Sequence, residues 1–114
     1  MKRILIVDDN AHIRKKLRES LEESGMEIIE AATKERARQH FAENPDFFAI
    51  LMDGWLDPSS DTCDLIEEFR QTFTGYIVAM STDEALLKRQ IIAGCSHSMS
   101  KERVSELVIQ LAQD

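Results

Sequence analysis

The chain has 114 residues, which is enough for one compact domain and too few for two. With 43% hydrophobic and 31% charged residues, its composition excludes a disordered or fibrous protein. The 21 acidic residues outnumber the 14 basic ones, and the net charge of -7 argues against direct binding to DNA or RNA. This charge favours a basic protein or a cation as the partner.

The first half of the chain alternates apolar runs with helical patterns. Residues 4–7 predict a strand that is buried on both faces. A helix follows, with Leu17 and Leu21 on its apolar face and Ser24-Gly25 at its end. A second strand, a helix that Asn44-Pro45 stops and a third strand are then expected over residues 26–31, 34–43 and 47–52.

The second half continues the alternation after a polar loop. Asp61 can cap a helix that includes Phe73 and that Thr74-Gly75 closes. The remaining expected elements are a strand, a helix capped by Thr82 or Asp83, a marginal strand and a final helix, over residues 76–80, 83–92, 97–99 and 104–111.

Five strands, each followed by a helix, predict an α/β fold of the flavodoxin-like (βα)5 kind. Such a doubly wound parallel sheet has helices on both faces and the strand order 2-1-3-4-5. No linker or internal repeat is visible, so we expect residues 1–114 to form a single domain.

Two further features of the sequence bear on location. No apolar run approaches the roughly 20 residues that a membrane-spanning helix needs, and no secretion signal is visible. The two cysteines, Cys63 and Cys95, lack metal-ligand spacing and are most simply free thiols in a reducing compartment. We therefore expect a cytoplasmic protein.

The polar residues that follow the strands form a chemically coherent set. In this fold the carboxyl ends of the strands converge on one edge, where Asp8, Asp9, Asp53, Ser81 and Lys101 are expected to meet. Three carboxylates that lie close together repel one another unless a cation neutralises them, and an oxygen-rich site suits Mg²⁺. A carboxylate beside a metal, a lysine and a hydroxyl can accept a phosphoryl group as an acyl phosphate.

Each of these residues also has a simpler interpretation when it is taken singly. Asp9 could cap the first helix, Ser81 could serve in a turn or cap, and Lys101 could be a solvated surface lysine. Their joint placement at the strand ends is what favours the functional interpretation.

The motifs Ile6-Val7-Asp8-Asp9-Asn10, Leu51-Met52-Asp53, Ala79-Met80-Ser81 and Gly94 through Lys101 resemble, in order and spacing, the response-regulator receiver domains of two-component signalling. The resemblance covers essentially the whole chain. It implies a phosphoacceptor switch that catalyses its own phosphorylation and dephosphorylation and does not turn over an external substrate.

The resemblance also implies a role for each site residue. Asp53 would be the phosphoacceptor, and Mg²⁺ would be held by Asp53, by Asp9 directly, by Asp8 through water and by the carbonyl of Trp55. Ser81 would be the switch hydroxyl and Lys101 the phosphate-binding lysine. The phosphodonor would be a sensor histidine kinase or a phosphotransfer protein, a further protein partner would receive the signal, and the chain would be a monomer or a dimer that forms on phosphorylation.

The sequence departs from the family pattern at four positions. The proline of the loop after Asp53 comes one residue late, as Pro58, which indicates an inserted residue. Thr82 is larger than the usual residue after the switch hydroxyl. Ser98 replaces the usual aromatic residue of the last strand, and Glu102 replaces a cis-proline, so we expect the Lys101–Glu102 peptide to be trans.

These departures keep a second hypothesis open, in which a degenerate receiver acts as an interaction module without phosphorylation. A third hypothesis is a phosphohydrolase with an aspartate nucleophile. Dehalogenase-like enzymes of that kind carry a general-acid aspartate two residues after the nucleophile, where this chain has Trp55.

Overall fold

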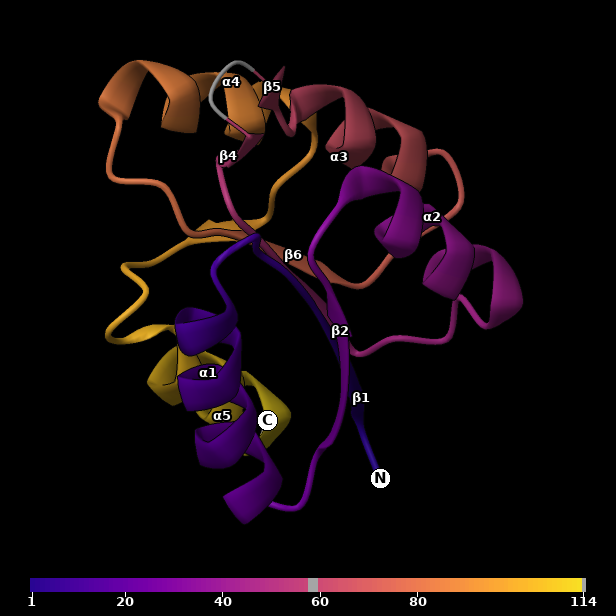
Figure 1. Ribbon diagram of the computed structural model, residues 1–114, viewed down its shortest axis with the longest axis vertical. Helices are drawn as coiled ribbons and strands as arrows, with labels where there is room; N and C mark the ends of the chain where they lie inside the picture. Colours follow the sequence, from indigo (N-terminus) through magenta and orange to yellow (C-terminus); the bar gives the residue numbers. More distant parts are fainter. Residues whose placement is uncertain (58–59, 114) are drawn as a thin grey trace.

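The computed structural model describes residues 1–57 and 60–113, which alternate between strands and helices (Figure 1). The elements are β1 (Arg3–Val7), α1 (Ala11–Glu23), β2 (Glu27–Ala31), α2 (Lys34–Glu43), β3 (Ala49–Met52), β4 (Trp55–Asp57), β5 (Ser60–Asp61), α3 (Cys63–Arg70), β6 (Tyr76–Ala79), α4 (Glu84–Ala93), β7 (His97–Ser98) and α5 (Val104–Gln113).

Five of the strands form one parallel sheet in the order β2-β1-β3-β6-β7. Because β6 and β7 are the fourth and fifth strands of this sheet, the order is the predicted 2-1-3-4-5 arrangement. The doubly wound flavodoxin-like fold expected from the sequence is therefore confirmed.

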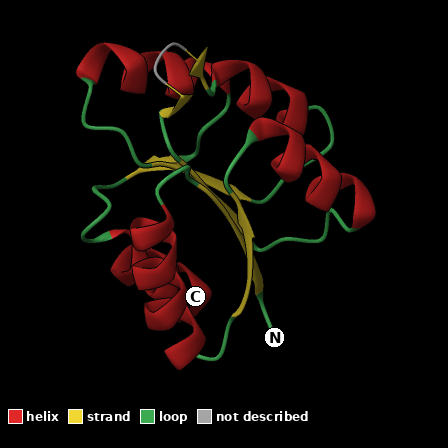
Figure 2. Ribbon diagram, in the orientation of Figure 1, coloured by secondary structure: helices red, strands yellow, loops and turns green. Residues whose placement is uncertain are grey.

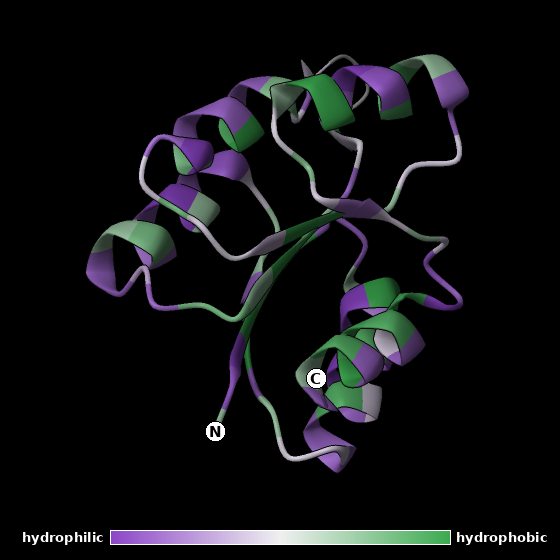
Figure 3. Cartoon of the chain, turned by 180° about the vertical axis from the view of Figure 1, so that it is seen from behind, coloured by the Kyte–Doolittle hydropathy of each residue, from purple (hydrophilic) through white to green (hydrophobic). Residues whose placement is uncertain are grey.

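The helices cover both faces of the sheet (Figure 2). α1 and α5 lie side by side on one face, and α2, α3 and α4 cover the other (Figure 1). Each interface has its own apolar core, one centred on Leu17, Leu21, Val104 and Val108 and the other on the buried side chains of α3. The apolar residues lie mainly in the sheet and on the inner faces of the helices, as the hydropathy colouring in Figure 3 shows.

Side chains fix where α1 and α4 begin. Asn10 Oδ1 accepts hydrogen bonds from the amides of His12 and Ile13, at 2.9 and 3.1 Å. Asp83 Oδ1 accepts from the amides of Ala85 and Leu86, at 3.0 and 3.2 Å. The interpretation of Asp9 as the cap of the first helix is thus wrong, and of the two caps considered for the later helix, Asp83 is the one used.

α4 has an unusual distribution of polar and apolar residues. Its inner face buries Leu86 and Ala93 together with the fully buried Gln90. Ile91 and Ile92 point the other way, with exposures of 50% and 85%.

Two local expectations need correction. The segment after Asp53 was expected to be a loop, but β4 and β5 pair there as a two-stranded antiparallel ribbon with an irregular register. Pro58, the proline that comes one residue late, lies outside the described residues.

The second correction concerns the end of α3, which stops at Arg70 instead of continuing through Phe73. The Arg70 guanidinium donates to the carbonyls of Phe73, Gly75 and Gly94, at 3.0, 2.7 and 2.8 Å. These bonds stabilise an early turn, and Phe73 is still buried.

Among the described residues, no helix combines the length and the apolar character that crossing a membrane requires. The described peptide bonds are all trans, so the trans geometry predicted for Lys101–Glu102 is confirmed. Cys63 and Cys95 are both free thiols, as expected.

Candidate functional site

The candidate site lies at the carboxyl edge of the sheet. Asp8 follows β1, Asp53 follows β3 and Ser81 lies just after β6. The main-chain amide of Asp53 donates to the carbonyl of Val7 at 2.9 Å, which extends the pairing of the two central strands and sets Asp53 beside Asp8.

Three carboxylates gather at this edge. Asp8, Asp9 and Asp53 each offer an oxygen, and these oxygens all lie within 4.8 Å of one another. Asp8 is completely buried and Asp53 is 9% exposed, whereas Asp9 is exposed. One side of the cluster is therefore shielded from water and the other is open to it.

Lys101 joins two of these carboxylates. Its Nζ lies 2.9 Å from Asp8 Oδ2 and 3.1 Å from Asp53 Oδ1. The amine balances part of the negative charge, which is the arrangement that a buried pair of carboxylates needs.

The main chain and α1 hold Asp8 in place. Its Oδ1 accepts a hydrogen bond from the amide of Asn10 at 2.9 Å, and its carbonyl accepts one from Arg14 Nη1 at 2.8 Å. The turn that starts α1 therefore also orients Asp8.

The surroundings shift the ionisation of the central pair. Burial raises the pKa of the Asp53 carboxyl above its ordinary value and the charge of Asp8 adds to the rise, while Lys101 and the Gly54 amide oppose it. For Lys101, burial by itself lowers the pKa, but the contacts with Asp8 and Asp53 outweigh it and the pKa is raised. Lys101 is thus a cation at neutral pH.

An open pocket of about 290 Å³ lies next to the carboxylates. Asp53, Ser81 and Lys101 line it, and so does Trp55, whose side chain is a rim residue with 41% exposure. Ser81 Oγ accepts a hydrogen bond from the Asp83 amide at 3.1 Å, so the hydroxyl proton is not used in that bond. The structure therefore brings together all the residues that the sequence singled out, around the acidic cluster or around this adjoining pocket.

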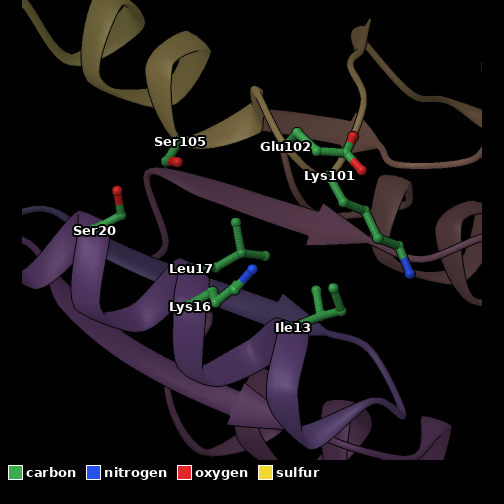
Figure 4. Close-up of a pocket in the computed structure, with 7 residues that line it drawn as sticks. All are labelled: Ile13, Lys16, Leu17, Ser20, Lys101, Glu102 and Ser105. Carbon is green, nitrogen blue, oxygen red and sulfur yellow. The ribbon is translucent and has the colours of Figure 1, made fainter.

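Lys101 also borders a second hollow of about 300 Å³ between α1 and the start of α5. Figure 4 shows the Lys101 side chain extending away from Ser105, with Ile13 and Leu17 on the α1 side.

The donor set fits a hard divalent cation. Carboxylate oxygens are the ligands that Mg²⁺ prefers, and the exposed side of the cluster leaves room for its water ligands. Asp8, Asp9 and Asp53 could hold such an ion.

Two buried polar residues near the site were not singled out from the sequence. Thr62 and Gln90 are both fully buried, and Gln90 Nε2 donates to Thr62 Oγ1 at 3.3 Å. Gln90 gave a usable signal, because it stands on the inner face of its helix between Leu86 and Ala93, where an apolar residue is expected. Thr62 gave none, because a threonine at the start of a helix is ordinary.

Comparisons with known proteins agree with this geometry. Residues 4–112 match the model of the response regulator receiver domain family. Comparison with curated proteins found no match.

Solved structures with the same fold include three response regulators. A two-component response regulator from Clostridium difficile is 24% identical with a TM-score of 0.88, over 99% of this chain and 97% of that one. The chemotaxis protein CheY4 of Vibrio cholerae is 22% identical with a TM-score of 0.82, over 99% and 97%. A CheY-like receiver domain protein from Methanospirillum hungatei is 25% identical with a TM-score of 0.79, over 99% and 91%.

Proposed function

Because the chain belongs to the response regulator receiver domain family, whose members are signalling switches, we propose that it accepts a phosphoryl group on Asp53 in a Mg²⁺-dependent reaction. The observation that carries the proposal is the pair of contacts from the Lys101 amine to Asp8 and to Asp53. A buried carboxylate is thus placed beside a cation and two further acids, at the edge of a pocket that contains a hydroxyl.

The chemistry follows from the contacts of Asp53. Its Oδ1 accepts from the Gly54 amide at 2.8 Å and lies next to Lys101, so we assign the attack on phosphorus to Oδ2. The bond from phosphorus to the donor's leaving group breaks as the new O–P bond forms, and the leaving group departs with the bonding electrons. Ser81 would donate its hydroxyl proton to one phosphoryl oxygen, and Lys101 would pair with another.

Asp9, Asp53 and the Trp55 carbonyl would hold Mg²⁺ directly and Asp8 would hold it through water, and the ion would supply positive charge beside the phosphoryl oxygens. Asp9 is the exposed member of the cluster. Hydrolysis of the acyl phosphate by water would then restore the Asp53 carboxylate, which is the proposed self-dephosphorylation.

Receiver domains take their phosphoryl group from histidine kinases or phosphotransfer proteins. We propose the same class of donor here, together with a downstream protein partner that distinguishes the two states. The net charge of -7 supports a protein with a basic docking surface as that partner.

The first test is incubation with acetyl phosphate and Mg²⁺, followed by mass spectrometry. We expect one phosphoryl group per chain, none with Asp53→Asn, and normal labelling with the control Asp46→Asn, which removes an exposed carboxylate outside the site. Absence of labelling in the wild type would favour an interaction module that works without phosphorylation, and unlimited release of phosphate would favour a phosphohydrolase.

The second test addresses the metal. Millimolar Mg²⁺ should change the fluorescence of Trp55, the only tryptophan, and Asp9→Ala should weaken the response because one oxygen ligand is lost. An identical titration curve for the variant would place the metal elsewhere.

A further inference from the structure

Helix α4 contacts the segment that follows Asp53 at three points. Gly54 packs beneath the helix so closely that a Cβ atom there would lie 2.6 Å from Leu86 Cδ2. On the surface, Arg89 Nη2 lies 2.5 Å from Asp61 Oδ2. The third contact is the buried hydrogen bond from Gln90 Nε2 to Thr62 Oγ1.

Thr62 closes the base of this segment. Its amide donates to the carbonyl of Gly54 at 3.1 Å, and its hydroxyl donates to the carbonyl of Asp53 at 2.6 Å. Both ends of the ribbon that carries Trp55 are therefore joined through one threonine.

The single hydroxyl proton of Thr62 decides which side chain donates in the contact between Gln90 and Thr62. The Thr62 hydroxyl has a single proton, and the short bond to the Asp53 carbonyl uses it, so Thr62 can only accept from Gln90. Gln90 must present its NH₂ group, and its Oε1 is then buried without a partner in the described parts of the chain. An unpaired buried acceptor is costly, so this contact holds α4 only moderately.

We infer that Gln90 and Thr62 are positioning residues that couple the Asp53 segment to α4. We call their hydrogen bond the Gln90–Thr62 link. A shift of the main chain at Asp53, or at the metal site beside it, moves Thr62 through its bond to the Asp53 carbonyl. Thr62 then moves the middle of α4 through its bond with Gln90. The role in signalling rests on the proposed function, whereas the link itself belongs to the fold without metal or phosphate.

The link supplies a route that does not depend on the last strand. Ser98 on β7 has no aromatic ring that could move behind Ser81, so the site needs another connection to the outer surface. Ile91 and Ile92 are exposed on the opposite side of α4 and would move with Gln90.

The test uses amide hydrogen exchange measured by NMR on the metal-free full chain. Gln90→Met keeps the length of the side chain and removes the donor, and Thr62→Val removes the hydroxyl. We expect Gln90→Met to speed exchange of the Thr62 amide roughly 3- to 10-fold, the range that loss of one net hydrogen bond gives. Thr62→Ser keeps a hydroxyl, so the amide of residue 62 should exchange at the wild-type rate. Gln90→Met should cause no further increase in that exchange rate when it is added to Thr62→Val.

Matched controls separate coupling from general loss of stability. Gln110→Met and Thr74→Val make the same substitutions at exposed positions and should leave the exchange rates unchanged. Unchanged exchange at Thr62 in Gln90→Met, or faster exchange spread evenly over the chain, would overturn the inference.

Mg²⁺ titrations of the same variants, followed through Trp55, give the second readout. Gln90→Met should weaken binding several-fold relative to the wild type and to Gln110→Met. Equal binding would overturn the coupling to the site. A wild type that does not respond to Mg²⁺ would instead refute the metal part of the proposed function, and the exchange data would still decide whether the link exists.

Discussion

Helix α1 begins with Asn10, which accepts hydrogen bonds from two amides of the first turn, and α4 begins with Asp83, which does the same. Beyond this first turn the two helices differ. α1 buries Leu17 and Leu21, whereas α4 buries Leu86 and Ala93 together with the polar Gln90.

Apolar burial and polar contacts hold the two helices in different ways. Apolar burial holds a helix in one position, because any shift exposes surface to water. Polar contacts such as those of Gln90 and Arg89 are individually weaker and can be exchanged for contacts with water. We therefore expect α1 to be a fixed support for Asp8 and α4 to shift more readily.

The largest difference should appear when a buried side chain of α1 and an exposed side chain of α4 are each truncated to alanine. We expect Leu21→Ala to lower the free energy of unfolding by about 2 to 5 kcal/mol, because it leaves a cavity in a fully buried position. Ile92→Ala should change it by less than about 0.5 kcal/mol, because this side chain is 85% exposed. Urea denaturation measures both, and a comparable loss in Ile92→Ala would show that the exposed face of α4 is packed against the protein.

The caps should have an intermediate effect. Asn10→Ala and Asp83→Ala each remove the acceptor for two amides and should cost about 1 kcal/mol. Asn10→Asp keeps an acceptor and serves as the control for α1. A cost in Asp83→Ala well above that in Asn10→Ala would contradict the similarity of the two helix starts.

The smallest effects concern two carboxylates whose pKa values shift in opposite directions. Burial and Asp8 raise the pKa of Asp53, so the native state binds more protons than the unfolded state and stability falls as pH rises through this range. Asp53→Asn should therefore stabilise the protein at pH 7, and this gain should shrink as pH falls through the raised pKa of Asp53 and be absent below the ordinary carboxyl pKa.

For Asp61, burial raises the pKa, but hydrogen bonds from the Cys63 amide and Arg89 outweigh it, and the net pKa is lowered. Its contribution to stability is present at pH 7 and is lost as pH falls through the folded pKa. Asp61→Asn should cost about 0.2 to 1 kcal/mol at pH 7, the range for a solvent-exposed ion pair. Thermal unfolding at pH 7 and at pH 3 measures both variants, and shifts of the same sign at pH 7 would refute the assignment.

The sequence predicted the sheet and the convergence of the site because both depend on simple regularities. Buried strands such as residues 4–7 are continuous apolar runs, and a parallel topology brings their carboxyl ends to one edge. The placement of Asp8, Asp53 and Lys101 follows from that topology alone.

The features that were missed depend on contacts between distant segments. α3 ends early because Arg70 donates to the carbonyl of Gly94, the residue that follows α4. Gln90 is buried where it meets Thr62, the residue before α3. β4 and β5 pair although neither shows a clear alternation of polar and apolar residues. Local patterns do not encode such contacts.

The position of Lys101 has one more consequence. Its amine would compete with a metal ion for the same carboxylate oxygens, because it already lies within 3.1 Å of both Asp8 and Asp53. Withdrawal of Mg²⁺ therefore leaves the two buried carboxylates with a cation between them. The fold need not depend on metal supply, and under the proposed Mg²⁺ dependence the response to the metal would be an exchange of one positive charge for another.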